Sequence, residues 1–162
     1  MPRVDINSLP PTSRTWLFGI SPALDETQSQ QVLQQVDAFL DQWAAHGAPV
    51  TSARTLLENS FLAIAVDERS ETSGCSIDRM FGLLRQLERD LSVKILDPSL
   101  VFVRHGDGHV SAMTREQFRA AADPHTVVFD TLAERLGDVR SGRWERRAAE
   151  SWHAKLLDTV RA

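Results

Sequence analysis

Apolar residues recur every three or four positions in two stretches of the chain, the spacing of one buried face of an α-helix. The first stretch begins at Asp25 and the second begins at Cys75 or Ser76. Gln28, three residues after Asp25, completes the pattern of a capping box, and Gly47 followed by Pro49 predicts that the first helix ends at His46–Gly47. The buried stripes consist of Val32, Val36, Phe39, Leu40 and Trp43 in the first helix and of Ile77, Met80, Phe81, Leu84, Leu87 and Leu91 in the second.

Shorter apolar runs at residues 15–20, 51–57 and 61–66 predict strands. The run at 61–66 (FLAIAV) has no polar position, which suits a central strand. The predicted order is therefore β-α-β-β-α. A further strand, at 93–96 or at 100–103, would complete a ferredoxin-like split βαβ sandwich, in which two long helices cover one face of an antiparallel sheet.

The last third of the chain predicts additions to that sandwich. Residues 100–105 and 109–113 favour a hairpin closed by Gly-Asp-Gly, and Thr114 with Gln117 caps a short helix that stops at Asp123–Pro124. Residues 126–129 favour a strand, and 144–160 favour a terminal helix with Trp144, Ala148, Trp152, Leu156 and Val160 on one stripe. This third has too few apolar residues for a core of its own, so we expect a single α+β domain over 1–162.

Composition restricts the protein class. The chain has 162 residues, the size of one domain, and 42% of them are hydrophobic. Its one cysteine excludes an internal disulfide and fits a reducing compartment. We find no signal-peptide pattern at the N-terminus and no apolar run longer than six residues, so the sequence predicts a cytoplasmic protein that does not insert in a membrane.

Charge and motif content narrow the partners. The formal net charge is −4, with 22 acidic and 18 basic residues, so we expect no nucleic-acid partner. The sequence has no Gly-Lys pair, which excludes a Walker A phosphate loop, and no dinucleotide-binding glycine pattern. We therefore predict no cofactor. The expected partner is a small anion or another protein, and a homodimer is one form of the latter.

The segment before the second helix contains the strongest candidate binding site. Backbone N–H groups at a helix start, beside a glycine, can form a nest for an anion. Ser73, Gly74 and Ser76 occupy that position here, and Asp67 and Glu68 lie in the loop that leads to it. These five residues are the predicted ligand-binding set.

Cys75 lies inside this segment and is the candidate catalytic residue. The N-terminal end of a helix stabilises a thiolate, which would make Cys75 a nucleophile or a redox sensor. A cysteine nucleophile usually needs a base. His46 is predicted to lie at the other end of the sheet, whereas His153 or His125 could reach the thiol, so His153 is the second catalytic candidate.

A simpler interpretation of the same residues is structural. Ser73 and Ser76 would cap the helix, Gly74 would make the turn, and Cys75 would fill a small buried apolar space. This interpretation is favoured over the reactive thiol.

His105 and His109 flank the predicted hairpin turn. Two histidines without a third ligand do not make a metal centre, so no metal site is predicted and the two side chains are expected to be exposed.

Several strings in this chain occur together: Trp16, WAAHG at 43–47, FLAIAVDE at 61–68, SGCSID at 73–78 and SWH at 151–153. The combination resembles a family of uncharacterised bacterial proteins of this length, met mostly in the Bacteroidetes lineage and often labelled "ABC transporter ATPase". That label conflicts with the absence of a phosphate loop. The resemblance implies a cytoplasmic, stand-alone protein and brings no established function.

Two functions remain. The leading hypothesis is a non-catalytic binding or regulatory module for a small ligand or a protein, because no complete catalytic constellation is visible. The alternative is a thiol-dependent enzyme or redox sensor built on Cys75.

Overall fold

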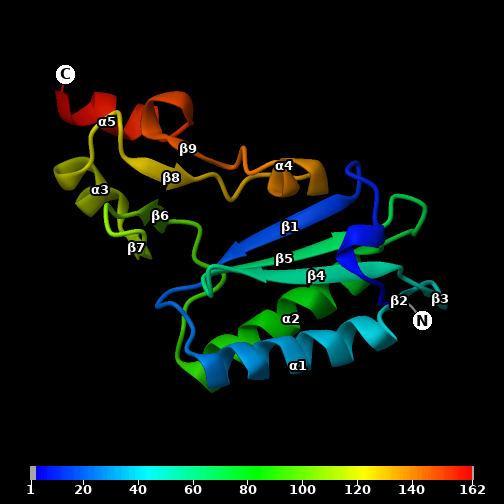
Figure 1. Ribbon diagram of the computed structural model, residues 1–162. Coiled ribbons are helices and arrows are strands. Elements are labelled where there is room, and N and C mark those ends of the chain that lie inside the picture. The colour runs from blue at the N-terminus through cyan, green and yellow to red at the C-terminus, as the bar shows by residue number, and fades with distance from the viewer. Residues whose placement is uncertain (1–2, 162) are drawn as a thin grey trace.

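The computed structural model describes the backbone of residues 3–161 and the side chains of residues 3–157. It is an α+β structure, as the sequence predicts, in which two helices lie on one face of a three-stranded sheet and the C-terminal elements lie over the other face (Figure 1). The elements of the helix-covered part are β1 (Arg14–Gly19), α1 (Glu26–Gln42), β4 (Ser52–Leu57), β5 (Phe61–Val66) and α2 (Gly74–Leu91).

The first sheet has the strand order β1-β5-β4, and both neighbouring pairs are antiparallel. Strands β1 and β4 therefore run parallel on either side of β5, and α1 makes the crossover between them. All six residues of β5 are buried, which explains why its sequence shows no alternation. The prediction of a central strand at 61–66 is confirmed.

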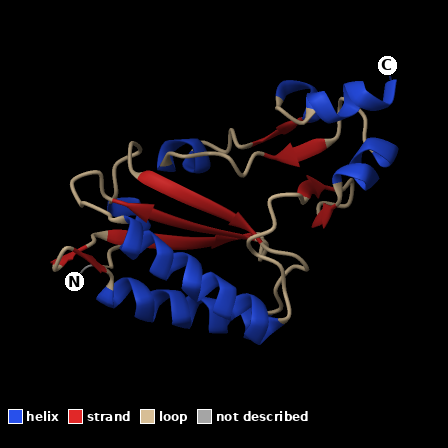
Figure 2. Ribbon diagram, turned by 180° about the vertical axis from the view of Figure 1, so that it is seen from behind, coloured by secondary structure: helices blue, strands red, loops and turns tan. Residues whose placement is uncertain are grey.

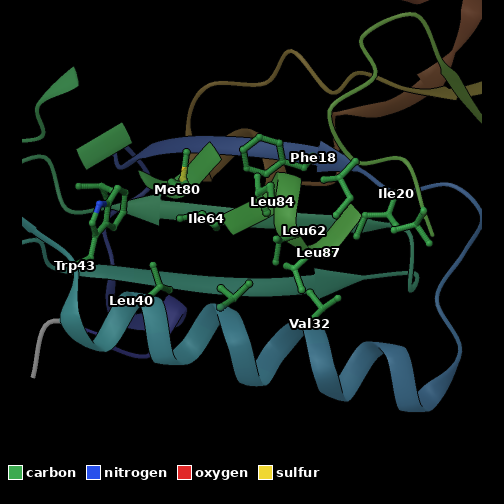
Figure 3. Close-up of a cluster of buried hydrophobic side chains, with 14 of the residues drawn as sticks. Phe18, Ile20, Val32, Leu40, Trp43, Leu62, Ile64, Met80, Leu84 and Leu87 are labelled. Atoms are coloured by element: carbon green, nitrogen blue, oxygen red, sulfur yellow. The ribbon is translucent and has the colours of Figure 1, made fainter. Parts of the chain in front are cut away.

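Both long helices begin with reciprocal caps. Asp25 accepts a hydrogen bond from the backbone N–H of Gln28, whose side chain accepts one from the N–H of Asp25. Ser73 and Ser76 form the same arrangement at the start of α2. The apolar stripes then face the sheet and enclose the main core (Figure 3). Its largest fully buried members include Trp43, Leu40, Leu62, Ile64, Met80, Leu84 and Leu87.

The predicted end of the first helix at His46–Gly47 is wrong. Helix α1 ends at Gln42, and Trp43 is already extended. Residues Ala44–Ala45 (β2) and Ala48–Pro49 (β3) form a small hairpin, in which His46 (φ 52°) and Gly47 (φ 78°) are the turn. Positive φ at both central residues is what a type I′ two-residue hairpin turn requires, so Gly47 serves a hairpin turn and not a helix end.

The second sheet has the order β7-β6-β8-β9 and is antiparallel throughout. Its strands are β6 (Val101–Arg104), β7 (Val110–Met113), β8 (Val127–Phe129) and β9 (Glu145–Arg147). The predicted hairpin, the helix α3 (Arg115–Ala121) capped by Thr114, and the strand at 126–129 are confirmed. This sheet, viewed from behind in Figure 2, lies on the side of β1 opposite to the long helices.

The predicted terminal helix over 144–160 is wrong. Residues Glu145–Arg147 form β9 beside β8, Ala148–Glu150 form the 3-10 turn η2, and only Ala154–Arg161 form a helix, α5. The side chain of Val160, the last member of the predicted stripe, lies outside the described residues. Two short elements have no counterpart in the prediction, η1 (Ile6–Ser8) and α4 (Leu136–Arg140). Within the described backbone, no helix has both the length and the hydropathy needed to cross a membrane.

Phe61 joins the two sheets. Its ring lies 5.1 Å from that of Phe102, 4.7 Å from that of Phe129 and 4.8 Å from that of Trp144, measured between ring centroids. Phe61 belongs to the first sheet and the other three to the second sheet or its loops. The two sheets therefore share an aromatic contact region.

Gly19 lets the second sheet approach β1 closely. A Cβ atom at residue 19 would lie 2.2 Å from the ring of Phe102. Replacing Gly19 with alanine is therefore expected to displace that ring and to lower the free energy of unfolding by about 1–3 kcal/mol, measured by urea denaturation.

Gly82 supplies a control for this substitution. It lies inside α2 with no atom within 4 Å of a built Cβ, so Gly82→Ala is expected to stabilise the protein by about 0.5–1 kcal/mol. Equal effects of the two substitutions would contradict the close approach of Phe102.

Candidate functional site

At the predicted anion nest before α2, a helix cap uses two of the backbone donors. The N–H of Ser73 donates to Oγ of Ser76 (2.8 Å), and the N–H of Ser76 donates to Oγ of Ser73 (3.1 Å). The N–H of Ile77 donates to the carbonyl of Ser73. The N–H groups of Ser73 and Ser76 thus have acceptors inside the cap, whereas the bond from Ile77 is the first ordinary bond of the helix; the capping interpretation of the two serines is confirmed.

The two acids of the predicted site differ in environment. Asp67 is buried, and its carboxylate accepts hydrogen bonds from the backbone N–H of Arg69 (2.9 Å) and from the Arg69 guanidinium (2.9 Å). The Arg69 side chain, and then its backbone N–H, hold the pKa of Asp67 below its usual value. Glu68 is exposed. Asp67 therefore closes the turn after β5 through its bonds to Arg69.

The structure does not bring Cys75 and His153 together. Cys75 is exposed at the second position of α2, so its interpretation as a buried filler is wrong. His153 is 1% exposed and lies just before α5, at the far side of the molecule from the start of α2 (Figure 1). His125 is exposed beside β8, also in the C-terminal part. Neither His153 nor His125 is therefore placed as a base for the thiol. The prediction that His46 lies at the other end of the sheet is wrong: the strand β2 just before it contacts α2, and the indole N–H of Trp43 donates to the carbonyl of Ser76, next to Cys75.

The surroundings of His153 are those of a core residue. Its Nδ1 lies 2.7 Å from Oγ of Ser151, and its ring stacks on Trp152 with 3.9 Å between centroids. Burial lowers the pKa of His153 to about 4; the charge of Asp130 opposes this effect and that of Arg115 adds to it. The side chain is held neutral inside the protein.

Because Cys75 is exposed, it is expected to react with a small alkylating reagent in the folded protein at a rate close to that in the unfolded chain. Mass spectrometry of samples quenched over time would measure both rates. Cys75→Ser should change the free energy of unfolding by less than about 0.5 kcal/mol, as for other surface substitutions. Alkylation only after unfolding would contradict the exposed position.

The hairpin histidines are near each other but lack further ligands. The rings of His105 and His109 stack at 4.2 Å, with 9° between their planes. Nε2 of His105 lies 2.6 Å from Oγ of Ser111, and Nδ1 of His109 contacts Asp107. Among the described residues there is no group of three or more His, Cys, Asp or Glu side chains that could hold a metal ion.

A different feature of the fold has open hydrogen-bonding groups, namely the outer edge of β1. Even-numbered β1 residues direct their backbone groups to β5, as the bond from Ile20 N–H to the carbonyl of Ser60 illustrates. Odd-numbered residues direct theirs away from β5. Thr15 N–H donates to the carbonyl of Glu134 (2.9 Å), and Ser21 N–H donates to that of Lys94 (2.9 Å).

Between these two bonds the edge is bare. The backbone N–H and C=O groups of Leu17 and Gly19 point outward, and no described residue pairs with them on that side. The predicted strand at 93–96 is reduced to one antiparallel bridge, between Ser21 and Lys94, and the alternative at 100–103 belongs to the second sheet as β6. The position of a fourth strand beside β1 is therefore open over about two residue pairs.

This bare edge forms part of a groove of about 560 Å³ between the two sheets. The groove is mainly apolar. Its walls come from β1, from α2 and the segment after it, and from the second sheet with its loops. The apolar residues of these walls include Phe81, Ile95, Leu96, Leu100, Phe102 and Leu132. Leu132 is 68% exposed, and no other large apolar residue with a described side chain is exposed.

Arg85 is the cation of this groove. It projects from α2 one turn after Phe81, whose ring meets Phe18 of β1 edge to face at 5.8 Å. Arg85 is exposed and forms no ion pair or hydrogen bond with a described residue. The other charged group of the groove, Asp97, is already paired with Lys94 and Ser99.

Sequence reasoning missed this groove. Its walls combine residues from four separated stretches of the chain, and the only related signal in the sequence was the open choice between 93–96 and 100–103 for the last strand of the sandwich. Comparison of the chain with family models, with curated proteins and with solved structures gave no match.

Proposed function

We propose that this protein is a non-catalytic binding module that docks an extended segment of another protein against the bare edge of β1. The observation that supports this is the pair of outward-facing backbone groups at Leu17 and Gly19 in an apolar groove. Adding a strand to an open sheet edge is a common mode of peptide recognition. Main-chain hydrogen bonds supply affinity, and side-chain pockets supply specificity.

We further propose that the first layer is a ferredoxin-like sandwich with an incomplete fourth strand. The order β1-β5-β4 and the crossover α1 support this assignment, and the bridge between Ser21 and Lys94 lies where the fourth strand of that fold would run. The docked segment would then take the place of the absent strand. Leu132 favours the same conclusion, because an exposed large apolar side chain beside an open edge marks an interaction surface.

A short segment fits this edge better than a second copy of the chain. The open stretch lies between Thr15 and Ser21, about 20 Å apart along an extended strand, and the chain's own segments at 134 and 94 close both ends. The β1 edge of another copy would carry the same flanking segments, which would collide. We therefore do not assign the groove to a homodimer.

The thiol alternative has less support. Cys75 is exposed, but no hydrogen bond or ion pair joins it to a histidine or a cation among the described residues. We propose membership of the uncharacterised bacterial family that the sequence resembles, but this family brings no activity that would support a reactive thiol. We infer that Cys75 is not the centre of the function.

A library of acetylated, amidated hexapeptides tests the proposed function. Peptides that bind the full chain are added to ¹⁵N-labelled protein, and the amide signals are followed by NMR. Expected is a shift of the Leu17 and Gly19 amides together with slower hydrogen exchange at both. An N-methyl group on the peptide residue that pairs with Gly19 should abolish binding, because it removes a main-chain donor.

On the protein side, the test uses Leu132→Asp, because Leu132 is the exposed large apolar residue of the groove. Leu132→Asp is expected to weaken binding at least tenfold while the thermal midpoint stays within about 2 °C. Binders that leave the Leu17 and Gly19 amides unaffected, or a library without binders, would refute the proposal.

A further inference from the structure

Resting on the proposed function, we infer that residues 95–97 are a strap that competes with the docked segment for Gly19, and that the carboxylate of Glu88 holds this strap open. Without that carboxylate the strap would extend the single bridge at Ser21 into a fourth strand. The chain thus carries its own competitor for half of the bare edge of β1.

The bridge between Ser21 and Lys94 fixes the register in which the strap would continue along β1. Each of the two residues donates its N–H to the carbonyl of the other, at 2.9 and 2.8 Å, so they form a hydrogen-bonded antiparallel pair. Ile95 is buried in the same core cluster as Ile20, as expected for the next pair of an antiparallel ladder, whose members point to the same face. The beginning of a fourth strand is therefore in place.

The next hydrogen-bonded pair of this ladder would be Gly19 with Leu96, because such pairs recur at every second residue. The outward N–H and C=O groups of Gly19 have no partner among the described residues. The N–H of Leu96 instead donates to Oε2 of Glu88 at 2.9 Å, and the N–H of Ile95 donates to the same oxygen at 2.8 Å. One carboxylate therefore takes the donor that the carbonyl of Gly19 would accept.

The chain leaves the strand conformation where Glu88 binds it. In a strand, consecutive side chains alternate between the two faces. Ile95 and Leu96, however, both pack against the core under the long helices, and the backbone bends at these two residues. Valine and isoleucine in the stretch 93–96 favour a strand, so the bonds to Glu88 override a local preference.

The groove offers a suitable surface to the closed strap. A side chain at position 19 would point to the ring of Phe102, and directly opposed residues of an antiparallel pair point to the same face. Leu96 would therefore turn from the helix side to the side of the second sheet on closing. That side is apolar, since Leu100, Phe102 and Leu132 line the groove there. Leu96 would exchange one apolar environment for another.

The strap can cover only half of the bare edge. Two residues beyond Leu96, Pro98 would stand opposite Leu17, and proline has no N–H to donate. Closure therefore satisfies Gly19 and leaves Leu17 open. A docked segment would pair first at Leu17 and then displace the strap from Gly19. Glu88 favours this displacement, because a carboxylate forms stronger hydrogen bonds with the released N–H groups than a neutral acceptor does.

Hydrogen exchange in the free full chain, followed by NMR, tests the strap without any peptide. Glu88→Ala removes the acceptor of both strap amides. We expect the amide of Gly19 to exchange about tenfold more slowly, the value of one average net hydrogen bond. The amide of Leu96 should stay protected by its new acceptor. The amide of Ile95, which points away from β1 in the closed ladder, should exchange faster.

A segment that merely loosens would give a different pattern. The amides of Ile95 and Leu96 would then both exchange faster while that of Gly19 stays unchanged, and this result would overturn the strap. Closure also has a positive signature. Phe18 and Asp97 would form the next non-hydrogen-bonded pair, so a nuclear Overhauser contact between their Hα atoms should appear in Glu88→Ala.

Asp90→Ala is the matched control. It removes an exposed carboxylate of the same helix, which accepts a bond from the side chain of Gln86, and should leave the exchange of Gly19 unchanged. Glu88→Gln keeps an acceptor but loses the charge, so it should slow Gly19 by a smaller factor than alanine does. If Glu88→Ala does not fold, the glutamine variant decides, and unaltered exchange at Gly19 there would overturn the strap.

Peptide binding separates this inference from the proposed function. Library peptides that shift the Leu17 and Gly19 amides should bind Glu88→Ala about tenfold more weakly, because they must first displace the closed strap. Equal affinity together with a slowed Gly19 amide would mean that the strap closes without competing, and would overturn its role. If no library peptide shifts those amides, the docking edge is refuted, whereas the exchange rates of the free protein still decide whether the strap closes.

Discussion

Truncating Phe61 to alanine is expected to lower the free energy of unfolding by about 3–5 kcal/mol, the range for removing a buried phenylalanine. The side chain is fully buried and contacts rings from residues 102, 129 and 144, so the cavity would have walls from both sheets. Urea denaturation followed by tryptophan fluorescence and by far-ultraviolet circular dichroism would measure the change. Both signals should shift together, because Trp43 lies in the first layer and Trp144 in the second.

Leu132→Ala is the control for this experiment, since its exposed side chain should change stability by less than about 0.5 kcal/mol. Two separate unfolding transitions, of which Phe61→Ala shifts only one, would show that the two sheets unfold as independent units. That result would contradict the expectation of one domain over residues 1–162.

The elements that sequence reasoning predicted correctly are those whose signals are local. The side chains of Asp25, Ser73 and Thr114 each accept a hydrogen bond from the backbone N–H three residues later. The side chain of that later residue in turn accepts one from the backbone N–H of the capping residue. Such a cap needs only four consecutive residues, so its pattern is visible in the sequence. The same holds for the hairpin at 101–113, whose turn residues and alternation are contiguous.

The failures occur where distant contacts override a local pattern. The spacing of Trp144 and Ala148 fits a helix, yet Trp144 packs on Phe61 and the residues after it pair with β8. Likewise, Trp43 leaves the helix because its indole N–H donates to the carbonyl of Ser76 (2.9 Å), a residue 33 positions away. Neither partner can be inferred from residues nearby in the chain.

The same reasoning explains the outcome for the candidate site. Ser73, Gly74 and Ser76 looked like a ligand cradle because a helix start exposes donors, but the capping box itself uses the N–H groups of Ser73 and Ser76. The groove beside β1 has the opposite character. Its residues carry no motif. Its open backbone donors become apparent only in the structure, where Glu134 and Lys94 bond to the two ends of the β1 edge and no described segment bonds to the residues between them.

His153 is expected to make the protein less stable as the pH falls from about 6.5 to about 4. In the folded protein burial lowers its pKa to about 4, against about 6.5 in the unfolded chain. Within this window the unfolded chain binds a proton that the folded protein does not, so acidification favours unfolding. The loss is up to about 3 kcal/mol and is complete below pH 4, where both states are protonated.

Urea denaturation at a series of pH values measures this effect, and His153→Phe isolates it. Phenylalanine retains an aromatic ring against Phe118 and Trp152 but cannot be protonated, so the dependence between pH 6.5 and 4 should flatten relative to the unsubstituted protein. His125→Phe alters an exposed ring and should leave the slope unchanged. An unchanged slope in His153→Phe would mean that His153 is protonated equally in both states, which its burial among the aromatic rings of the second layer does not allow.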